Sequence, residues 1–170
     1  MNRYLLAPLL TSLLGACATM PPPLASGSFA AITPKMAQQQ DSAGERVRWG
    51  GIIVATTPTP KETCIEILSR PLDSQGRPRQ TDQTDGRFIS CTQGFHDPAV
   101  YAAGREVTVT GTLAPSVVRK IGDYSYRYPN LPADVLYLWP KREEYRPLPY
   151  YDPYWDPFWR PWPYYRWPYY

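Results

Sequence analysis

The chain has 170 residues, of which 43% are hydrophobic and 19% are charged, a composition that suits one small folded domain with additional segments. The net charge is only +3, so composition alone gives no support for a nucleic-acid-binding protein. The 21 prolines, 14 tyrosines and 6 tryptophans are unusually many, and most of the tyrosines and tryptophans lie after Glu144, which divides the chain into a body and a tail.

Residues 1–16 have the features of a signal peptide for export. Arg3 adds positive charge to the amino terminus, and the apolar run from Leu5 to Leu14 is much shorter than the roughly 20 residues that span a membrane. The run ends in Leu-Gly-Ala-Cys at 14–17, which is similar to the lipobox of bacterial lipoproteins, whose cysteine receives lipid before the signal is removed. The alternative is an ordinary secretory signal with a chance cysteine.

The lipobox resemblance implies that Cys17 is lipidated and anchors the mature protein. Several acyl chains hold a protein stably on a membrane, whereas one holds it only marginally. The next residue is Ala18, and in the sorting pattern of such lipoproteins an aspartate at this place favours retention in the inner membrane. We therefore expect a lipid anchor in the outer membrane and a folded part that faces the periplasm.

Residues 17–45 are expected to form a flexible, lipidated tether. They contain the runs Pro-Pro-Pro, Ser-Gly-Ser and Gln-Gln-Gln and show little apolar periodicity. Only residues 29–32 have a composition that suits a short ordered piece.

The body, residues 46–140, contains six segments typical of β-strands, at 47–55, 64–68, 87–91, 106–113, 124–128 and 135–139. Gly50-Gly51 within the first segment indicates a bulge or sharp bend. In the fourth, valine and leucine alternate with threonine, which predicts a half-buried strand. Between the third and fourth segments, Asp97 as N-cap, Pro98 and Gly104 predict a short helix.

This order of elements predicts a mainly β fold, namely a small OB-like antiparallel barrel with one short helix between the third and fourth strands. The alternative is a plain antiparallel sandwich.

Cys64 and Cys91 remain as a pair once Cys17 is assigned to the lipid, and each lies in or beside a strand-like segment. In an oxidising compartment such a pair favours a disulfide, which contributes ~3 kcal/mol, over two reduced thiols or a metal pair. No CxxC spacing occurs and His96 is the single histidine, so no metal is expected.

A search for catalytic motifs is mostly negative, and we expect no enzyme, catalytic residue or cofactor. His96 precedes the predicted helix and is interpreted as a polar surface residue. Four aspartates (Asp73, Asp82, Asp85 and Asp97) are interpreted as turn residues, because aspartate hydrogen-bonds its own backbone there. If their strands are neighbours, Arg48, Arg87 and Arg105 could form a basic strip.

Several strings resemble the Slp family of starvation-inducible outer-membrane lipoproteins. They are VRWGGII (47–53), RPLDSQGRP (70–78), DGRFI (85–89), GREVTVTG (104–111), KIGDYSYRYP (120–129) and LW (138–139). They occur in the family's order and cover roughly residues 45–140. The resemblance implies an outer-membrane lipoprotein linked to slow growth or starvation, without established catalytic activity. The cysteine pair and the tail are not among the family's defining features.

The Tyr/Trp/Pro-rich tail, residues 141–170, contains too much proline for a helix or a strand ladder. Three interpretations remain open: contact with the membrane surface, stacking on glycan or a protein partner, and disorder with partial collapse onto the body. The residues expected to make an envelope or glycan contact are Tyr154, Trp155, Trp159, Trp162 and Trp167.

Two functions are consistent with these features. The first is a non-enzymatic outer-membrane lipoprotein with a structural or stress-related role. The alternative is a periplasmic glycan- or ligand-binding module that uses the barrel face and the tail. The expected partners are the outer membrane and either peptidoglycan or an envelope protein, and no nucleic acid.

Overall fold

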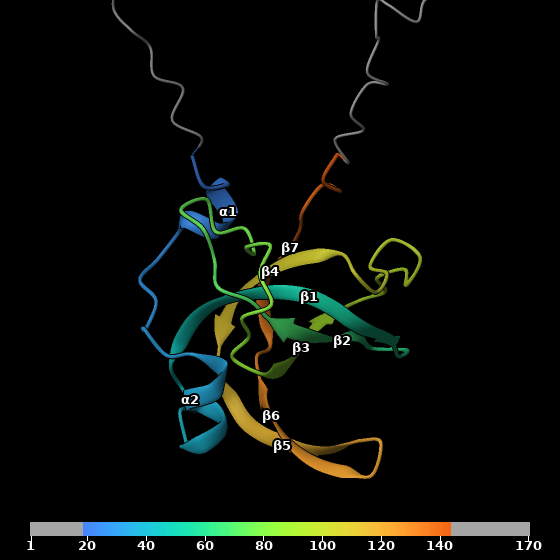
Figure 1. The fold of residues 1–170 in the computed structure, drawn as a ribbon. Coiled ribbons are helices and arrows are strands. Elements are labelled where there is room, and N and C mark those ends of the chain that lie inside the picture. Colours follow the sequence, from blue (N-terminus) through green and yellow to red (C-terminus); the bar gives the residue numbers. More distant parts are fainter. Residues whose placement is uncertain (1–18, 144–170) are drawn as a thin grey trace, which may run out of the picture.

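The computed structural model describes residues 19–143, in which seven strands form one mixed sheet (Figure 1). The strands are β1 (Arg46–Pro58), β2 (Glu62–Ser69), β3 (Arg87–Gln93), β4 (Glu106–Thr112), β5 (Ala114–Ile121), β6 (Tyr124–Asn130) and β7 (Ala133–Leu138). Their order in the sheet is β5-β6-β3-β2-β1-β4-β7. All neighbours are antiparallel except β3 and β6, which are parallel and joined at the single pair Ile89 and Asn130.

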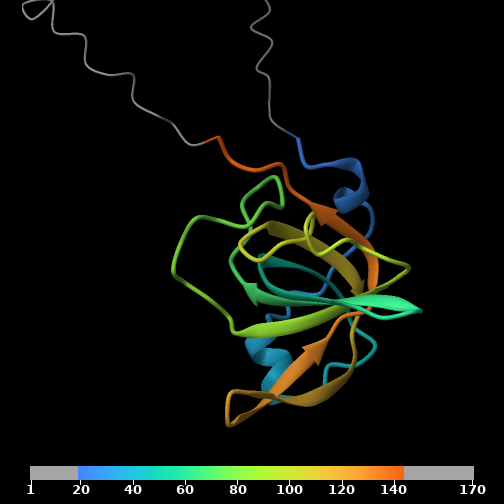
Figure 2. The same cartoon turned by 90° about the vertical axis from the view of Figure 1, so that its right-hand side faces the viewer.

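The mainly β fold is confirmed, but the closed antiparallel barrel is wrong. Only Leu131 and Pro132 separate β6 from β7 in the chain, although these strands lie on opposite flanks of the sheet, so the sheet must curl (Figures 1 and 2). The curled sheet has no full ladder of backbone hydrogen bonds between β3 and β6, because Pro129 and Pro132 have no backbone N–H to donate. The backbone pairing of β6 with β3 is limited to Asn130, followed by the bond from the Leu131 N–H to the Ile89 carbonyl, 2.8 Å.

Strand β1 is shared between two partners along its length. Its first part pairs with β4 from Arg46 to Ile52, and its second part pairs with β2 from Gly51 to Pro58. Gly51 lies where the two pairings overlap, and a Cβ on it would lie 2.0 Å from the Leu68 carbonyl oxygen. The register shift lies further along, between Ile53 and Ala55, so the glycines permit a close backbone approach and the bulge predicted at Gly50-Gly51 is displaced.

Two short helices precede the sheet, α1 (Pro22–Ala25) and α2 (Pro34–Gln39). The flexible tether predicted over 17–45 is therefore wrong for its described part. Leu24 and Ala37 are buried, and the indole N–H of Trp49 donates to the Ile32 carbonyl at 2.7 Å. Helices of four and six residues are too short to show apolar periodicity, which is why the sequence pattern missed them. Within residues 19–143, no helix is long and apolar enough to cross a membrane.

The helix predicted over 97–104 is also wrong, since that segment forms only turns. Asp97 does cap a turn: its Oδ1 accepts from the Ala99 N–H, 2.8 Å, and its carbonyl accepts from Tyr101. The chain then enters the sheet, where the Gly104 N–H donates to the Ile53 carbonyl at 2.9 Å. These bonds to β1 replace the helical bonds that would continue the turn.

Strand β4 is buried on both faces, contrary to the half-buried strand expected. Val107 and Val109 join the core, where Trp49 meets Phe88 edge to face at 5.2 Å. On the opposite face Thr108 is covered as well, because its hydroxyl donates to the Gly76 carbonyl at 2.7 Å. Burial of both faces makes β4 a central element of the fold.

Strand β5 was not expected from the sequence. Pro115 argues against a strand, yet β5 lies at the edge of the sheet, where a residue without an N–H is tolerated. Together β5 and β6 form a hairpin that projects from the body on the side away from the described ends of the chain (Figures 1 and 2).

We predict that Gly51→Ala destabilises the fold by about 2–4 kcal/mol, because the new Cβ meets backbone that cannot move without separating β1 from β2. Denaturant unfolding would measure the loss. Gly44→Ala is the control: nothing lies within 4 Å of its Cβ, but its φ of +90° costs about 1 kcal/mol. Equal losses in the two variants would contradict the role assigned to Gly51.

Candidate functional site

Of the residues predicted to form sites, the structure describes only the cysteine pair. Cys17 lies outside the described residues, as do the aromatic residues Tyr154, Trp155, Trp159, Trp162 and Trp167.

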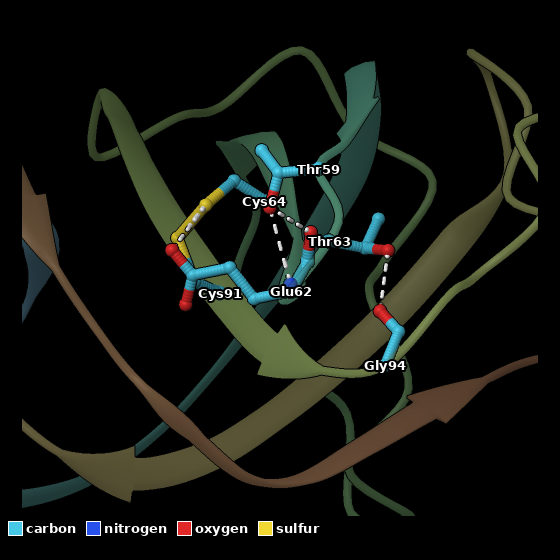
Figure 3. The surroundings of a disulfide bond; sticks show 6 residues. All are labelled: Thr59, Glu62, Thr63, Cys64, Cys91 and Gly94. Carbon is cyan, nitrogen blue, oxygen red and sulfur yellow. Dashed lines mark hydrogen bonds between the residues drawn. A yellow bond between two sulfur atoms is a disulfide. The ribbon is translucent and has the colours of Figure 1, made fainter.

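Cys64 and Cys91 form a disulfide, as predicted, and they face each other across β2 and β3 (Figure 3). The adjacent Thr63 points to the buried face, where its hydroxyl donates to the Gly94 carbonyl at 2.8 Å. Within residues 19–143, a Glu62 carboxylate oxygen and the two sulfurs place three atoms of metal-ligating type within 4.8 Å of one another. Because the sulfurs are bonded to each other, they offer no thiolate to a metal.

Potential catalytic side chains are occupied by structural contacts or lie apart. The His96 ring packs edge to face on Tyr101, with centroids 4.8 Å apart. Asp73 acts as a turn residue, since its Oδ1 accepts from the N–H groups of Gln75 and Arg77, each at 2.9 Å. With the Asp97 cap, these contacts support the interpretation of Asp73 and Asp97 as turn formers.

The basic strip of Arg48, Arg87 and Arg105 does not form. Strand β3, which begins at Arg87, is not a neighbour of β1. Arg48 stacks 4.8 Å from the Phe29 ring centroid and donates to the Leu24 carbonyl, so it is occupied by the N-terminal segment. Each of the three arginines thus has separate partners.

A different basic cluster gathers around Glu106, the first residue of β4. Arg77 Nε donates to Glu106 Oε2 at 2.6 Å, and Arg142 Nε donates to Glu106 Oε1 at 2.9 Å. The Glu106 side chain is only 11% exposed, and a carboxylate so enclosed is stabilised by such charge-assisted bonds. Arg77 also lies 5.4 Å from the Trp139 ring centroid. The cluster joins the 73–78 turn, β4 and the segment after β7.

Beside this cluster lies a hollow of about 450 Å³. Four cationic side chains and one carboxylate line it: Arg70, Arg105, Lys141, Arg142 and Glu106. Short side chains from the β3–β4 connection, among them Ala99 and Ala102, form another wall. The excess of positive charge makes this hollow the candidate site for an anion.

Sequence reasoning missed this site, because its residues come from distant parts of the chain and Arg142 falls in the segment assigned to the tail. The available signal was that Arg70 and Arg77 lie in one of the strings with family resemblance, and Arg105 and Glu106 in another.

Both described ends of the chain meet near this site. Met20 packs over Gly76, where an added Cβ would lie 3.3 Å from Met20 Cε, and Arg142 Nη2 donates to the Pro78 carbonyl at 2.8 Å. Figures 1 and 2 show the two ends leaving from one side of the domain. The N-terminal and C-terminal segments therefore depart close to the basic hollow.

A second polar cluster fixes β6 to the middle of the sheet. Arg87 Nη1 and the Tyr128 hydroxyl both donate to Glu66 Oε1, at 2.6 and 2.9 Å. Burial raises the pKa of the Tyr128 hydroxyl above its ordinary value, and the bond to Glu66 raises it further, whereas Arg87 lowers it in part. The hydrogen bond to Glu66 raises the pKa of Arg87. This cluster is structural, since its polar atoms bond to one another.

The fold, the disulfide and the Glu106 cluster define a small domain of mainly β structure, with a basic hollow near the described ends of the chain. The family model of the outer membrane lipoprotein Slp family matches residues 14–170, so the chain belongs to this family. Its similarity to family members is consistent with the strings identified in the sequence.

Two relatives come from Escherichia coli K12. An uncharacterized lipoprotein, YeaY, is 32% identical over 132 residues, covering 74% of this chain and 66% of the relative. The outer membrane protein Slp is 26% identical over 138 residues, covering 79% and 73%. An uncharacterized protein of Haemophilus influenzae is 42% identical over 94 residues, covering 55% and 51%. The chain thus spans from about half to about three quarters of these relatives.

Among solved structures, the mitochondrial single-stranded DNA binding protein Rim1 of S. cerevisiae matches 59% of this chain and 99% of its own, with 17% identity and a TM-score of 0.37.

We predict that replacing both disulfide cysteines (Cys64→Ala with Cys91→Ala) lowers the free energy of unfolding by about 3 kcal/mol, because the bond closes a loop with a sequence separation of 27. Reductant should lower the stability of the natural protein by a similar amount and leave the double variant unchanged. A natural protein that does not respond to reductant would contradict a bridged pair.

A second prediction concerns the free energy of unfolding at alkaline pH. Folding raises the pKa of Tyr128, so the stability that its protonated hydroxyl contributes is fully present below the ordinary tyrosine pKa of about 10. That stability is lost as the pH rises through the raised pKa. Unfolding free energies measured across this range should fall less steeply in Tyr128→Phe than in the natural protein. Tyr124→Phe, at a site 70% exposed, should keep the natural slope. Identical slopes in all three proteins would refute the assignment.

Proposed function

We propose that this protein is lipidated on Cys17 and held at the periplasmic face of the outer membrane, where it has a non-enzymatic structural or stress-related role. The family membership supports the outer-membrane lipoprotein class. The stress-related role rests on the resemblance of the sequence strings to the starvation-inducible lipoproteins. The lipobox-like sequence at 14–17 supports Cys17 as the anchor.

The observation that carries the proposal is the small number of residues between Cys17 and the packed domain. Helix α1 begins at Pro22, five positions after Cys17, and Leu24 within it is fully buried. Five extended residues reach at most about 18 Å. A lipid on Cys17 would therefore hold the domain close to the membrane, with the α1 side nearest to it.

The position of the described C-terminal residues supports a second contact with the membrane, made by the tail on the same side as the anchor. Arg142 and Met20 both pack on the turn at residues 76–78, so the tail starts near the anchored end. Tyrosine and tryptophan favour the interface between lipid and water. This favours the membrane-surface interpretation of the tail over contact with distant glycan.

The non-enzymatic part of the proposal is supported by the contacts of the reactive side chains. In the described region, His96 packs on an aromatic ring, Glu66 and Glu106 are bound by arginines, and Asp73 and Asp97 bind backbone N–H groups. The carboxylate oxygens of these four acidic residues are committed to contacts that hold the fold.

We predict that Cys17→Ser abolishes incorporation of a labelled fatty acid and removes the protein from the outer-membrane fraction, because the anchor is lost. The matched control is Ala18→Asp, which keeps the acceptor cysteine and should remain lipidated but shift toward the inner-membrane fraction on a density gradient. Labelling that persists in Cys17→Ser would overturn the assigned anchor.

The same fractionation tests the tail. If the mature chain with Cys17→Ser still binds membranes in part, ending the chain at Glu144 should weaken that binding. Residual binding that this truncation leaves unchanged would contradict a contact made by the tail.

A further inference from the structure

The hollow beside Glu106 has a charge that its own residues do not balance. Its lining has four cationic side chains against one carboxylate, and both oxygens of that carboxylate accept from arginines. One of these arginines, Arg77, lies outside the lining and adds further positive charge. An arrangement of this kind attracts an anion.

Two arginines of the hollow, Arg105 and Arg142, are held in place and still have donors to offer. Arg105 donates through Nη1 to the Val100 carbonyl and through Nη2 to the Trp139 carbonyl, and Arg142 donates through Nε and Nη2. A guanidinium has five N–H donors, so each of these groups keeps several. Arg70 makes no side-chain hydrogen bond or ion pair with the described part of the chain, residues 19–143. Arg105 and Arg142 are therefore preorganised, whereas no bond within residues 19–143 keeps the Arg70 side chain from turning toward a ligand.

The anion that suits this geometry is a phosphate group. Guanidinium forks bind phosphate oxygens in pairs, and a tetrahedral phosphate can accept from several forks that approach from different sides. The volume of about 450 Å³ falls in the range of small-ligand sites and exceeds what a bare ion needs, so the phosphate can carry a polar substituent.

The hollow also lies near the attached end of the domain. Met20 packs over Gly76, the adjacent Arg77 binds Glu106, and Glu106 binds Arg142 in the wall of the hollow. Through Gly76 and Arg77, these contacts connect the segment that follows Cys17 to the basic residues of the hollow. A domain held by a short link at Cys17 would therefore bring the hollow within reach of lipid head groups.

We propose that this hollow binds a phosphate group and that the head groups of the adjacent membrane leaflet supply it. The phosphate site follows from the residues of the hollow alone, whereas the lipid as its source rests on the proposed membrane anchoring. In this arrangement the lipid on Cys17 sets the distance from the membrane, and the head-group contact sets the orientation of the domain.

The test uses the mature chain, residues 17–170, with Cys17→Ser, so that no acyl chain contributes to binding. Sedimentation would compare vesicles of phosphatidylcholine alone with vesicles that also contain phosphatidylglycerol. We expect preferential binding to the anionic vesicles. A basic residue near such a surface changes binding by about fivefold, so Arg70→Gln with Arg142→Gln should weaken it ~30-fold.

The matched control is Arg119→Gln with Lys120→Gln, which removes the same charge from the exposed hairpin and should leave vesicle binding within about twofold, because these residues lie on the side away from the chain ends. Arg70→Gln alone guards against misfolding, because its side chain supports no bond in the described fold, and it should still weaken binding about fivefold. Equal losses in the control pair and the hollow pair, or no preference for anionic vesicles, would overturn the proposal.

Calorimetry with inorganic phosphate separates the two possible sources. Weak phosphate binding that Arg70→Gln diminishes, together with vesicle preference, supports the lipid head group. Phosphate binding without vesicle preference would overturn the lipid source and assign the hollow to a soluble phosphate compound. Since the protein carries no lipid, these results are independent of whether Cys17 is the anchor.

Discussion

The structure depends on one constraint, the division of β1 between two partners. Its first part pairs with β4 and its second with β2, and the two pairings overlap only around Gly51 and Ile52. Strands in a sheet twist, so a strand that changes partners along its length directs the sheet to curl. The overlap requires backbones closer than a side chain allows, since a Cβ on Gly51 would meet the Leu68 carbonyl oxygen. The curl then lets two residues connect β6 to β7, and it encloses the core of Trp49 and its neighbours.

The same curl creates the basic site. It brings the turn at 73–78 over β4, where Thr108 bonds to Gly76 and Trp139, and this places Arg77 next to Glu106. Glu106 is nearly buried, and a buried carboxylate is costly unless it is fully paired. Two guanidiniums meet that need, and one of them comes from the segment after β7. A packing requirement of the sheet thus fixes arginines in the wall of the hollow, and Lys141 and Arg142 follow β7 directly into it.

Sequence patterns predicted the elements that are encoded locally. Six of the seven strands were expected near their observed positions, and the disulfide followed from two cysteines in strand-like segments. Several of the wrong predictions have a common cause: contacts between distant parts of the chain, rather than the local sequence, determine the structure there. Pro115 is tolerated because β5 is an edge strand, and the turn at Asp97 stops because Gly104 pairs with Ile53. The Glu106 cluster joins positions 77, 106 and 142, and no local pattern links residues so far apart.

The geometry limits which surfaces could meet other envelope components. Under the proposed anchoring, the side with α1, the basic hollow and the chain ends faces the membrane, and the β5–β6 hairpin projects away from it (Figure 1). The hairpin carries Val118 and Tyr124, each 70% exposed, whereas the disulfide and the Glu66 cluster brace the strands behind it. Under that anchoring, an exposed hairpin with both apolar and basic side chains on a braced sheet is a part of the domain that another component can reach without displacing it from the lipid. Membrane attachment and outward contact would therefore use opposite ends of the same curled sheet.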